Sequence, residues 1–172
     1  FLNQMLKKET SQPNLYPCHR LDRETSGLII YAFGKAIQQK MMEEFKQKRV
    51  KKKYIAFVQG ALPKNEGIIN FKIENSPALT RYKILEKRPS GFSIVEVEPG
   101  TGKTNQIRLH FKMLGHPIIG ERRFAFAKDF SLKFRRLALH AKEISFFHPL
   151  SGKLMHFCQE IPLDMKDFLL YN

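Results

Sequence analysis

The chain has 172 residues, a length that fits one domain. Its 30 Lys and Arg outnumber its 16 Asp and Glu, giving a formal charge of +14, yet 42% of the residues are hydrophobic. That fraction excludes a disordered chain, because disorder combines high charge with low hydrophobicity. The longest apolar run, Gly27–Phe33, is too short to span a membrane, and two distant cysteines, Cys18 and Cys158, suit a reducing compartment. We therefore expect a basic globular domain in the cytoplasm, not bound to a membrane.

Hydrophobic patterning predicts both helices and strands in the first half of the chain. Gly27–Phe33 is continuously apolar and of strand length, so we expect one buried strand there. Lys35–Arg49 carries Ile37, Met41 and Phe45 on one face, which predicts an amphipathic helix. The other expected elements are a helix over Leu2–Lys8, followed by a polar loop, and strands over Tyr54–Val58 and Ile68–Ile73.

Turn residues divide the second half into short elements. A Pro-Ser-Gly turn joins Arg81–Leu85 and Phe92–Val97 into a predicted hairpin. Thr104–Leu114 has a helical apolar face that Gly115 and Pro117 end. Further strands are expected near Leu137–His140, Glu143–Phe147 and Lys153–Phe157, and a helix over Asp164–Leu170. Because strands outnumber helices and short turns join them, the predicted fold class is α+β with a largely antiparallel sheet.

The basic residues gather in two segments. Six of the eight residues of Lys46–Lys53 are Lys or Arg. Six more basic residues lie within Arg122–Arg136, where they alternate with phenylalanines at positions 124, 126, 130 and 134. Cations beside aromatic faces are typical of proteins that bind unstacked nucleic acid, but for these phenylalanines core packing is favoured, because Phe is ordinarily buried. The net charge itself favours a polyanion as binding partner, and it favours nucleic acid more than a membrane surface.

Several motifs with known chemistry are incomplete. Pro99–Thr104 (PGTGKT) resembles a phosphate-binding loop, but Val97 stands where the first glycine belongs, and no strand ends in a magnesium-binding Asp. Cys18-His19 and His156-x-Cys158 lack the spacing of a zinc site. No G-x-S-x-G elbow is present. We therefore expect neither a metal nor a nucleotide cofactor.

Asp22 is the most informative single residue. It lies between Arg20 and Arg23 in the segment HRLDRETSG, directly before the apolar run. A neighbouring guanidinium would hold its carboxylate ionised, and a loop fixed to a buried strand is a common place for reactive groups. A surface ion pair at a turn would leave the same pattern. The residues alone leave both interpretations open.

Four motifs in order resolve this choice by resemblance. His19–Gly27 (HRLDRETSG) resembles the signature loop of the RluA-type RNA pseudouridine synthases, and Lys53-Tyr54-Ile55-Ala56 resembles the strand of that family that carries an active-site tyrosine. Gly102–His110 with Gly115–Gly120 resembles the G-R-x-H-Q-[IL]-R-x-H…G-H-P-[IL]-x-G helix, and Leu139–Ala141 with His148-Pro149 the closing L-H-A…H-P segment. The matches cover most of the chain from His19 onward.

The resemblance implies a fold and an activity. Residues 1–172 would form one pseudouridine synthase-like catalytic domain, incomplete at its N-terminus, with a largely antiparallel mixed sheet, flanking helices and an active-site cleft. The implied activity is the isomerisation of uridine to pseudouridine in structured RNA after the base is flipped out. Ribosomal RNA is favoured over transfer RNA as the substrate. No cofactor is implied, and we expect a monomer.

The resemblance also implies roles for single residues. Asp22 would be the catalytic aspartate, Tyr54 would pack against the target base and could transfer a proton, and Arg108 would pair with the aspartate. Lys103 and Asn105 depart from the family, which has Arg and His there. The residues implied to contact RNA are Arg20, Arg23, Lys103, Asn105, Gln106 and Ile107.

A non-catalytic RNA-binding or ribosome-associated module on the same fold is the alternative. Such a module would have little need for Asp22, Tyr54 and Arg108 together, so the enzyme is favoured. Whether Asp22 attacks the base or the sugar, or removes a sugar proton, stays open.

Overall fold

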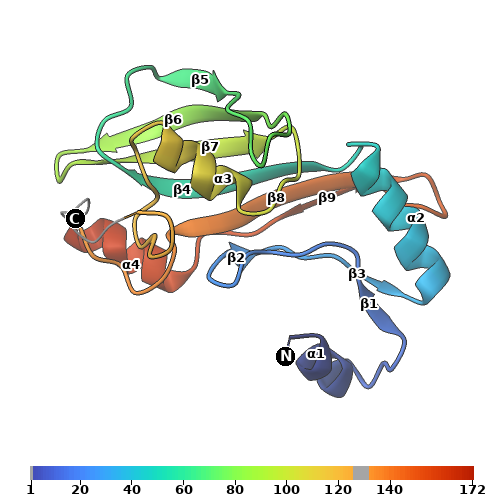
Figure 1. The fold of residues 1–172 in the computed structure, drawn as a ribbon. Coiled ribbons are helices and arrows are strands. Elements are labelled where there is room, and N and C mark those ends of the chain that lie inside the picture. Colours follow the sequence, from blue (N-terminus) through green and yellow to red (C-terminus); the bar gives the residue numbers. More distant parts are fainter. Residues whose placement is uncertain (1, 126–131) are drawn as a thin grey trace.

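The computed structural model describes residues 2–125 and 132–172, and a seven-stranded sheet forms its body (Figure 1). Every pairing in this sheet is antiparallel except that of β2 with β8. The strand β9 (Leu154–Cys158) pairs with the second half of β8, on the edge where β2 pairs with the first half. Across the sheet the order is β2 (Ser26–Gly27), β8 (Leu139–Phe147), β4 (Lys51–Gln59), β7 (Phe92–Pro99), β6 (Thr80–Arg88) and β5 (Glu66–Ile69).

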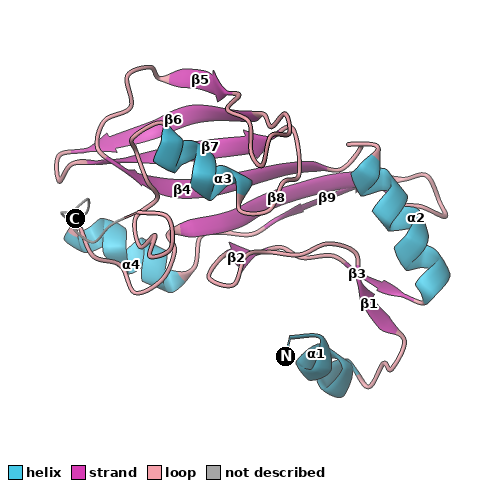
Figure 2. Ribbon diagram, viewed as in Figure 1, coloured by secondary structure: helices cyan, strands magenta, loops and turns pink. Residues whose placement is uncertain are grey.

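A small second sheet and the helices complete the described part (Figure 2). The strands β1 (Leu15–Pro17) and β3 (Tyr31–Phe33) pair antiparallel, away from the main sheet. The helices are α1 (Leu2–Thr10), α2 (Lys35–Lys46), α3 (Gln106–Met113) and α4 (Leu163–Tyr171).

The main core lies on both faces of β4, where Tyr54–Val58 are all buried. Tyr54, Val97 and Tyr82 lie opposite one another on neighbouring strands, and Phe111 of α3 packs against the Tyr82 ring. The helix α4 covers the other face, because its Phe168 ring lies 6.0 Å from that of Phe57. One face of the sheet therefore carries α3 and the other carries α4.

A smaller core lies where α2 meets the far end of β8. Met41 of α2 is 2% exposed and packs with Ala32, Val50 and Phe146. Because β8 contributes to this core and to the main one, a continuous strand links the two.

The predicted class, α+β with a largely antiparallel mixed sheet, is confirmed, but the single buried strand over Gly27–Phe33 is wrong. The segment splits into β2 and β3, which belong to different sheets. Gly27 adopts a φ of +110° beside β8, and the chain then leaves the sheet edge. Within the segment only Ala32 is fully buried. The apolar run reflects partial contact with the smaller core rather than a central strand position.

Two other strand predictions also change. The two strands expected over Leu137–His140 and Glu143–Phe147 form one strand, β8, because a bulge absorbs Lys142 opposite the Lys53–Tyr54 step of β4. The strand expected over Ile68–Ile73 ends at Ile69, and Ile73 instead forms an isolated bridge with Ser76.

No helix in the described ranges is long and apolar enough to cross a membrane.

Candidate active site

Asp22 lies in a loop that is tied down before and after it. His19 accepts a hydrogen bond at Nε2 from the backbone N–H of Ile30, over 2.9 Å, and its ring packs 4.8 Å from that of Phe45. Within the loop, the Thr25 N–H donates to the Asp22 carbonyl over 3.0 Å and closes a turn. Burial and nearby Lys52 lower the pKa of His19 to about 4, so the ring is neutral and free to accept this bond at neutral pH.

The far end of the loop is fixed against β8. A Cβ atom at Gly27 would stand 2.3 Å from the Ala141 carbonyl oxygen, so only glycine allows the chain to approach this closely. Beside it, Ser26 Oγ and His140 Nδ1 lie 3.0 Å apart. The Ser26-Gly27 and Leu-His-Ala motifs therefore contact each other, although they are more than a hundred residues apart in sequence.

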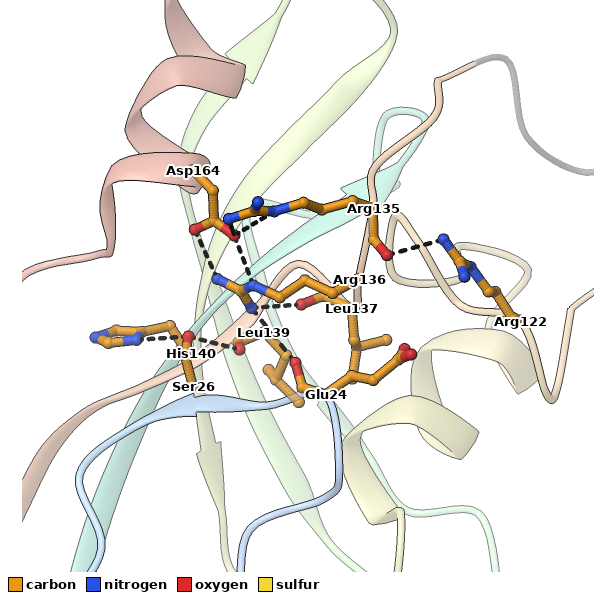
Figure 3. A network of polar contacts seen from close by, with 9 residues as sticks. All are labelled: Glu24, Ser26, Arg122, Arg135, Arg136, Leu137, Leu139, His140 and Asp164. Atoms are coloured by element: carbon orange, nitrogen blue, oxygen red, sulfur yellow. Dashed lines mark hydrogen bonds and ion pairs between the residues drawn. The ribbon is translucent and has the colours of Figure 1, made fainter. Parts of the chain in front are cut away.

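An arginine clamp joins the same loop to α4 (Figure 3). Arg136 donates to both carboxylate oxygens of Asp164, over 2.7 and 2.9 Å, and its Nη1 reaches the Glu24 carbonyl at 3.4 Å and that of Leu137 at 2.9 Å. Arg135 also contacts Asp164, from a more exposed position. The clamp therefore connects the loop, at a point two residues after Asp22, to the first turn of the terminal helix α4.

Arg108 of α3 faces Asp22, but its main partner is another carboxylate. It makes a two-pronged ion pair with Glu121, over 2.6 and 2.8 Å, and its Nη1 donates to Asn105 Oδ1 over 2.9 Å. The same Nη1 lies 3.8 Å from Asp22 Oδ2. Arg108 is thus fixed by Glu121 and Asn105, and presents its remaining edge to Asp22.

The surroundings of Asp22 act on its charge in opposite directions. Burial, the largest effect, raises the pKa of the carboxyl, while Arg108 and Arg20 oppose the rise and Glu121 adds to it. The net result is a pKa above the ordinary value of an aspartate. The expected stabilisation of the ionised form by Arg108 is present, but burial outweighs it.

Tyr54 lies on the central strand β4. Burial and the charge of Asp22 raise the pKa of its phenol to about 12. Tyr54 therefore carries its proton at neutral pH and lines the same pocket as the Asp22 carboxylate.

These side chains border one pocket of about 140 Å³. Asp22, Tyr54, Arg20, Lys103, Asn105, Gln106 and Ile107 all line it. Arg108 is absent from the lining and contacts Asp22 from behind, and Arg23 is exposed and also outside the lining. The incomplete phosphate-loop motif forms one wall, through Pro99 and the loop over residues 101–104.

Gln106 uses its amide inside the protein. Its Nε2 donates to the Leu79 carbonyl and to Thr80 Oγ1, and its Oε1 accepts from Thr101 Oγ1 and the Lys103 N–H. The residue is 4% exposed. Its amide therefore fixes the loop before α3 to β6, and its side of the pocket is preformed.

Sequence reasoning assigned no site role to several lining residues, among them Thr25, Lys52 and Leu139. Thr25 has a buried hydroxyl that finds no hydrogen-bond partner among the described residues. Lys52 and Leu139 also line the pocket. For Lys52 the basic run was the available signal, but its five charged neighbours in that run concealed which side chain turns inward. Leu139 carried a signal only as the residue before the His-Ala pair.

The phenylalanines of the second basic segment divide between two roles. The Phe134 ring packs 5.3 Å from Phe168 in the main core, whereas the Phe124 ring lies 4.8 Å from the Arg108 guanidinium carbon. Phe126 and Phe130 lie outside the described residues. Among those that are described, no group of three or more His, Cys, Asp or Glu side chains could hold a metal ion.

The sequence of this chain is similar to proteins of one known family. A family model described as RNA pseudouridylate synthase matches residues 1–113. The dual-specificity RNA pseudouridine synthase RluA of Pasteurella multocida is 36% identical over 156 residues, which cover 82% of this chain and 71% of that protein. The ribosomal large subunit pseudouridine synthase C of Buchnera aphidicola is 34% identical, and the match covers 78% of this chain and 49% of that protein.

Solved structures agree. Human RNA Pseudouridylate Synthase Domain Containing 1 superposes with a TM-score of 0.80 at 28% identity, covering 94% of this chain and 74% of that one. Human RNA Pseudouridylate Synthase Domain Containing 4 has the same TM-score at 22% identity, which shows the fold alone. Since sequence relatives and the fold converge, the chain belongs to the RluA family of RNA pseudouridine synthases and is an isomerase.

Proposed function

We propose that the pocket binds one uridine flipped out of a structured RNA and that Asp22 carries its isomerisation. The observation that supports this most is the Asp22 carboxylate, held 3.8 Å from Arg108 in a small pocket that Tyr54 also lines. At about 140 Å³ the pocket is smaller than the roughly 300–1,000 Å³ of sites that bury drug-sized ligands. A single nucleobase is a group of a size that matches this volume.

The reaction breaks the bond between N1 of the base and C1′ of the ribose and forms a new one from C5. The proton on C5 leaves and N1 gains one, so atoms balance without an oxidant or a cofactor. Asp22 acts by bonding to the base or the sugar or by removing a sugar proton, and each route needs the ionised carboxylate. Arg108 and Arg20 favour that form against the effect of burial.

Tyr54 and Thr25 serve the base in this proposal. Tyr54 offers an aromatic face for stacking, which offsets the cost of flipping, and a phenol that keeps its proton at neutral pH. The unpartnered Thr25 hydroxyl is a donor with no acceptor among the described residues, so a polar atom of the nucleotide would satisfy it. Ile107 adds an apolar wall.

Structured RNA is the proposed substrate, and ribosomal RNA is preferred over transfer RNA. One relative is named for the large ribosomal subunit and others for dual specificity, so both classes belong in the test. A formal charge of +14 suits either polyanion.

The test is tritium release from RNA transcribed with 5-tritiated uridine. We expect the protein to release tritium to water from ribosomal or transfer RNA transcripts, because rejoining through C5 expels that atom. Asp22→Asn should release none while binding the RNA unchanged, and Lys83→Gln, on β6 and outside the pocket, should retain the activity. Binding without any release, by a protein that is folded, would favour the non-catalytic RNA-binding module instead.

A further inference from the structure

A wide groove opens from the pocket toward α2. Its volume is about 690 Å³, several times that of the pocket, and the two share Arg20, Lys52, Pro99, Thr101 and Gly102. One wall comes from the end of α2 and the start of β4, and the other from the β7–α3 loop. The groove and the pocket therefore adjoin each other.

Most of the charged side chains that line the groove are Lys or Arg, and Glu98 supplies the single carboxylate of the lining. Lys53 is neutralised by Glu96 and Glu98, at 3.2 and 3.6 Å, and Lys46 lies 3.9 Å from Glu43. The lining cations that have no carboxylate within 4.0 Å, among the described residues, are Arg20, Lys48, Lys51, Lys52 and Arg81.

Lys52 stands where the groove meets the pocket. Its ammonium lies 5.7 Å from the centre of the Phe45 ring, and burial lowers its pKa. A half-buried cation without a carboxylate is costly in a folded protein unless a ligand supplies the negative charge. An anion at the mouth of the pocket would supply it.

We propose that the RNA strand next to the target uridine runs through this groove, with its phosphates on Lys48, Lys51 and Arg81 and one phosphate at Lys52. The inference rests on the proposed function, because it places the strand by its continuity with the base pocket. A phosphate chain carries one charge per nucleotide, which matches a row of unpaired cations along a channel. Glu98, already bonded to Lys53, adds little repulsion.

Two substitutions remove charge from the groove without disturbing the fold. Lys48 has a φ of +58°, a conformation that asparagine tolerates well, so Lys48→Asn keeps the backbone. Lys51 is exposed at the start of β4, so Lys51→Gln costs no packing. The matched control is Lys83→Gln with Lys87→Gln, which removes two exposed charges from β6, outside the groove. Neither pair includes a residue of the base pocket.

Binding is measured by anisotropy of a fluorescein-labelled 15-nucleotide oligouridine at several salt concentrations. Losing two phosphate contacts from a single strand should make the slope of log affinity against log salt shallower by about 1.4. The groove variant should show this change and the control should keep the wild-type slope. Equal slopes for both double variants would overturn the proposal.

Turnover separates this inference from the function it rests on. With tritiated transcripts, the groove variant should raise KM about tenfold and leave kcat within twofold of wild type, because the base pocket is intact. If the wild type releases no tritium, the proposed function fails while the salt slopes still report on the groove. If the wild type is active and both variants share its KM and slope, the groove proposal alone fails.

Discussion

Asp22 destabilises the fold in its ionised state. Its pKa is raised, mainly by burial, so the folded protein holds the proton more tightly than the unfolded chain does. Stability therefore falls as pH rises from the ordinary carboxyl pKa through the raised one, and stays lower above it.

Asp22→Asn should therefore increase the melting temperature at pH 7 while abolishing tritium release. An asparagine fills the same space without the buried charge, and Arg108 keeps its pair with Glu121. The gain should vanish below the ordinary carboxyl pKa, where both states of the wild type are protonated. Thermal melts from pH 3 to 8 check this, and a melting temperature that drops at pH 7 would contradict it.

His19 makes the opposite contribution. Its pKa is lowered from 6.5 to about 4, so the unfolded chain binds more protons between these values and stability rises with pH through that window. The shift corresponds to as much as ~3 kcal/mol, lost as pH falls from 6.5 to 4. His19→Gln should flatten the dependence of the free energy of unfolding on pH, measured by urea unfolding across that range. The variant should lose most stability, relative to wild type, at pH 7. A wild-type stability that is constant over this window would refute the assignment.

At this scale the motifs located Asp22 and Tyr54 in the pocket, and Arg108 beside it, from the sequence. They did not predict the dominant Arg108–Glu121 pair or the inward turn of Lys52. Both depend on which segments meet in space, and that information lies outside any local motif. Gln106 matched its motif too, yet its amide bonds only within the protein, because a motif records residue type and not hydrogen-bond partners.

At the scale of elements, the active-site loop depends on α4, a helix that contributes nothing to the pocket lining. Asp164→Asn should weaken the ion pair with Arg136 and lower the free energy of unfolding by roughly 1.5–3 kcal/mol. Since Arg136 would then no longer be held against the Glu24 carbonyl, the loop should be positioned less well, and kcat should fall more than KM changes. Asp164→Glu should recover part of kcat.

Asp167→Asn is the control for this clamp. Asp167 is exposed on the same helix and has no ion pair among the described residues. Urea unfolding and tritium-release kinetics of the three variants check the prediction. Asp164→Asn behaving like Asp167→Asn in both measurements would show that the loop stands without the clamp.

The patterns predicted helices and turns better than strands. The apolar face of α2 and the Pro-Ser-Gly hairpin were recognisable because each is a local signal. The split of Gly27–Phe33 and the continuity of β8 were not, because a glycine at positive φ and a bulge across from β4 decide them through long-range pairing. Next to the loop that carries Asp22, tertiary contacts rather than local apolar runs thus determine where the strands begin and end.

At the scale of the molecule, two cores share one strand. The main core takes Leu139 and Ala141 from β8, and the smaller core takes Ile144 and Phe146 from the same strand. A strand that is continuous through both cannot unfold in one core without exposing residues of the other. We therefore propose that residues 1–172 form one cooperative domain, which also places the groove and the base pocket in one rigid unit.

Met41→Ala tests that cooperativity. Met41 is 2% exposed in the smaller core, so its truncation should lower the free energy of unfolding by ~2–5 kcal/mol. Circular dichroism follows the helices and tyrosine fluorescence follows residues such as Tyr54 and Tyr82 in the main core, and both transitions should shift together by the same amount. An early loss of helical signal with an unmoved tyrosine transition would mean that α2 melts alone. In that event the groove, whose wall includes the end of α2, would open independently of the pocket.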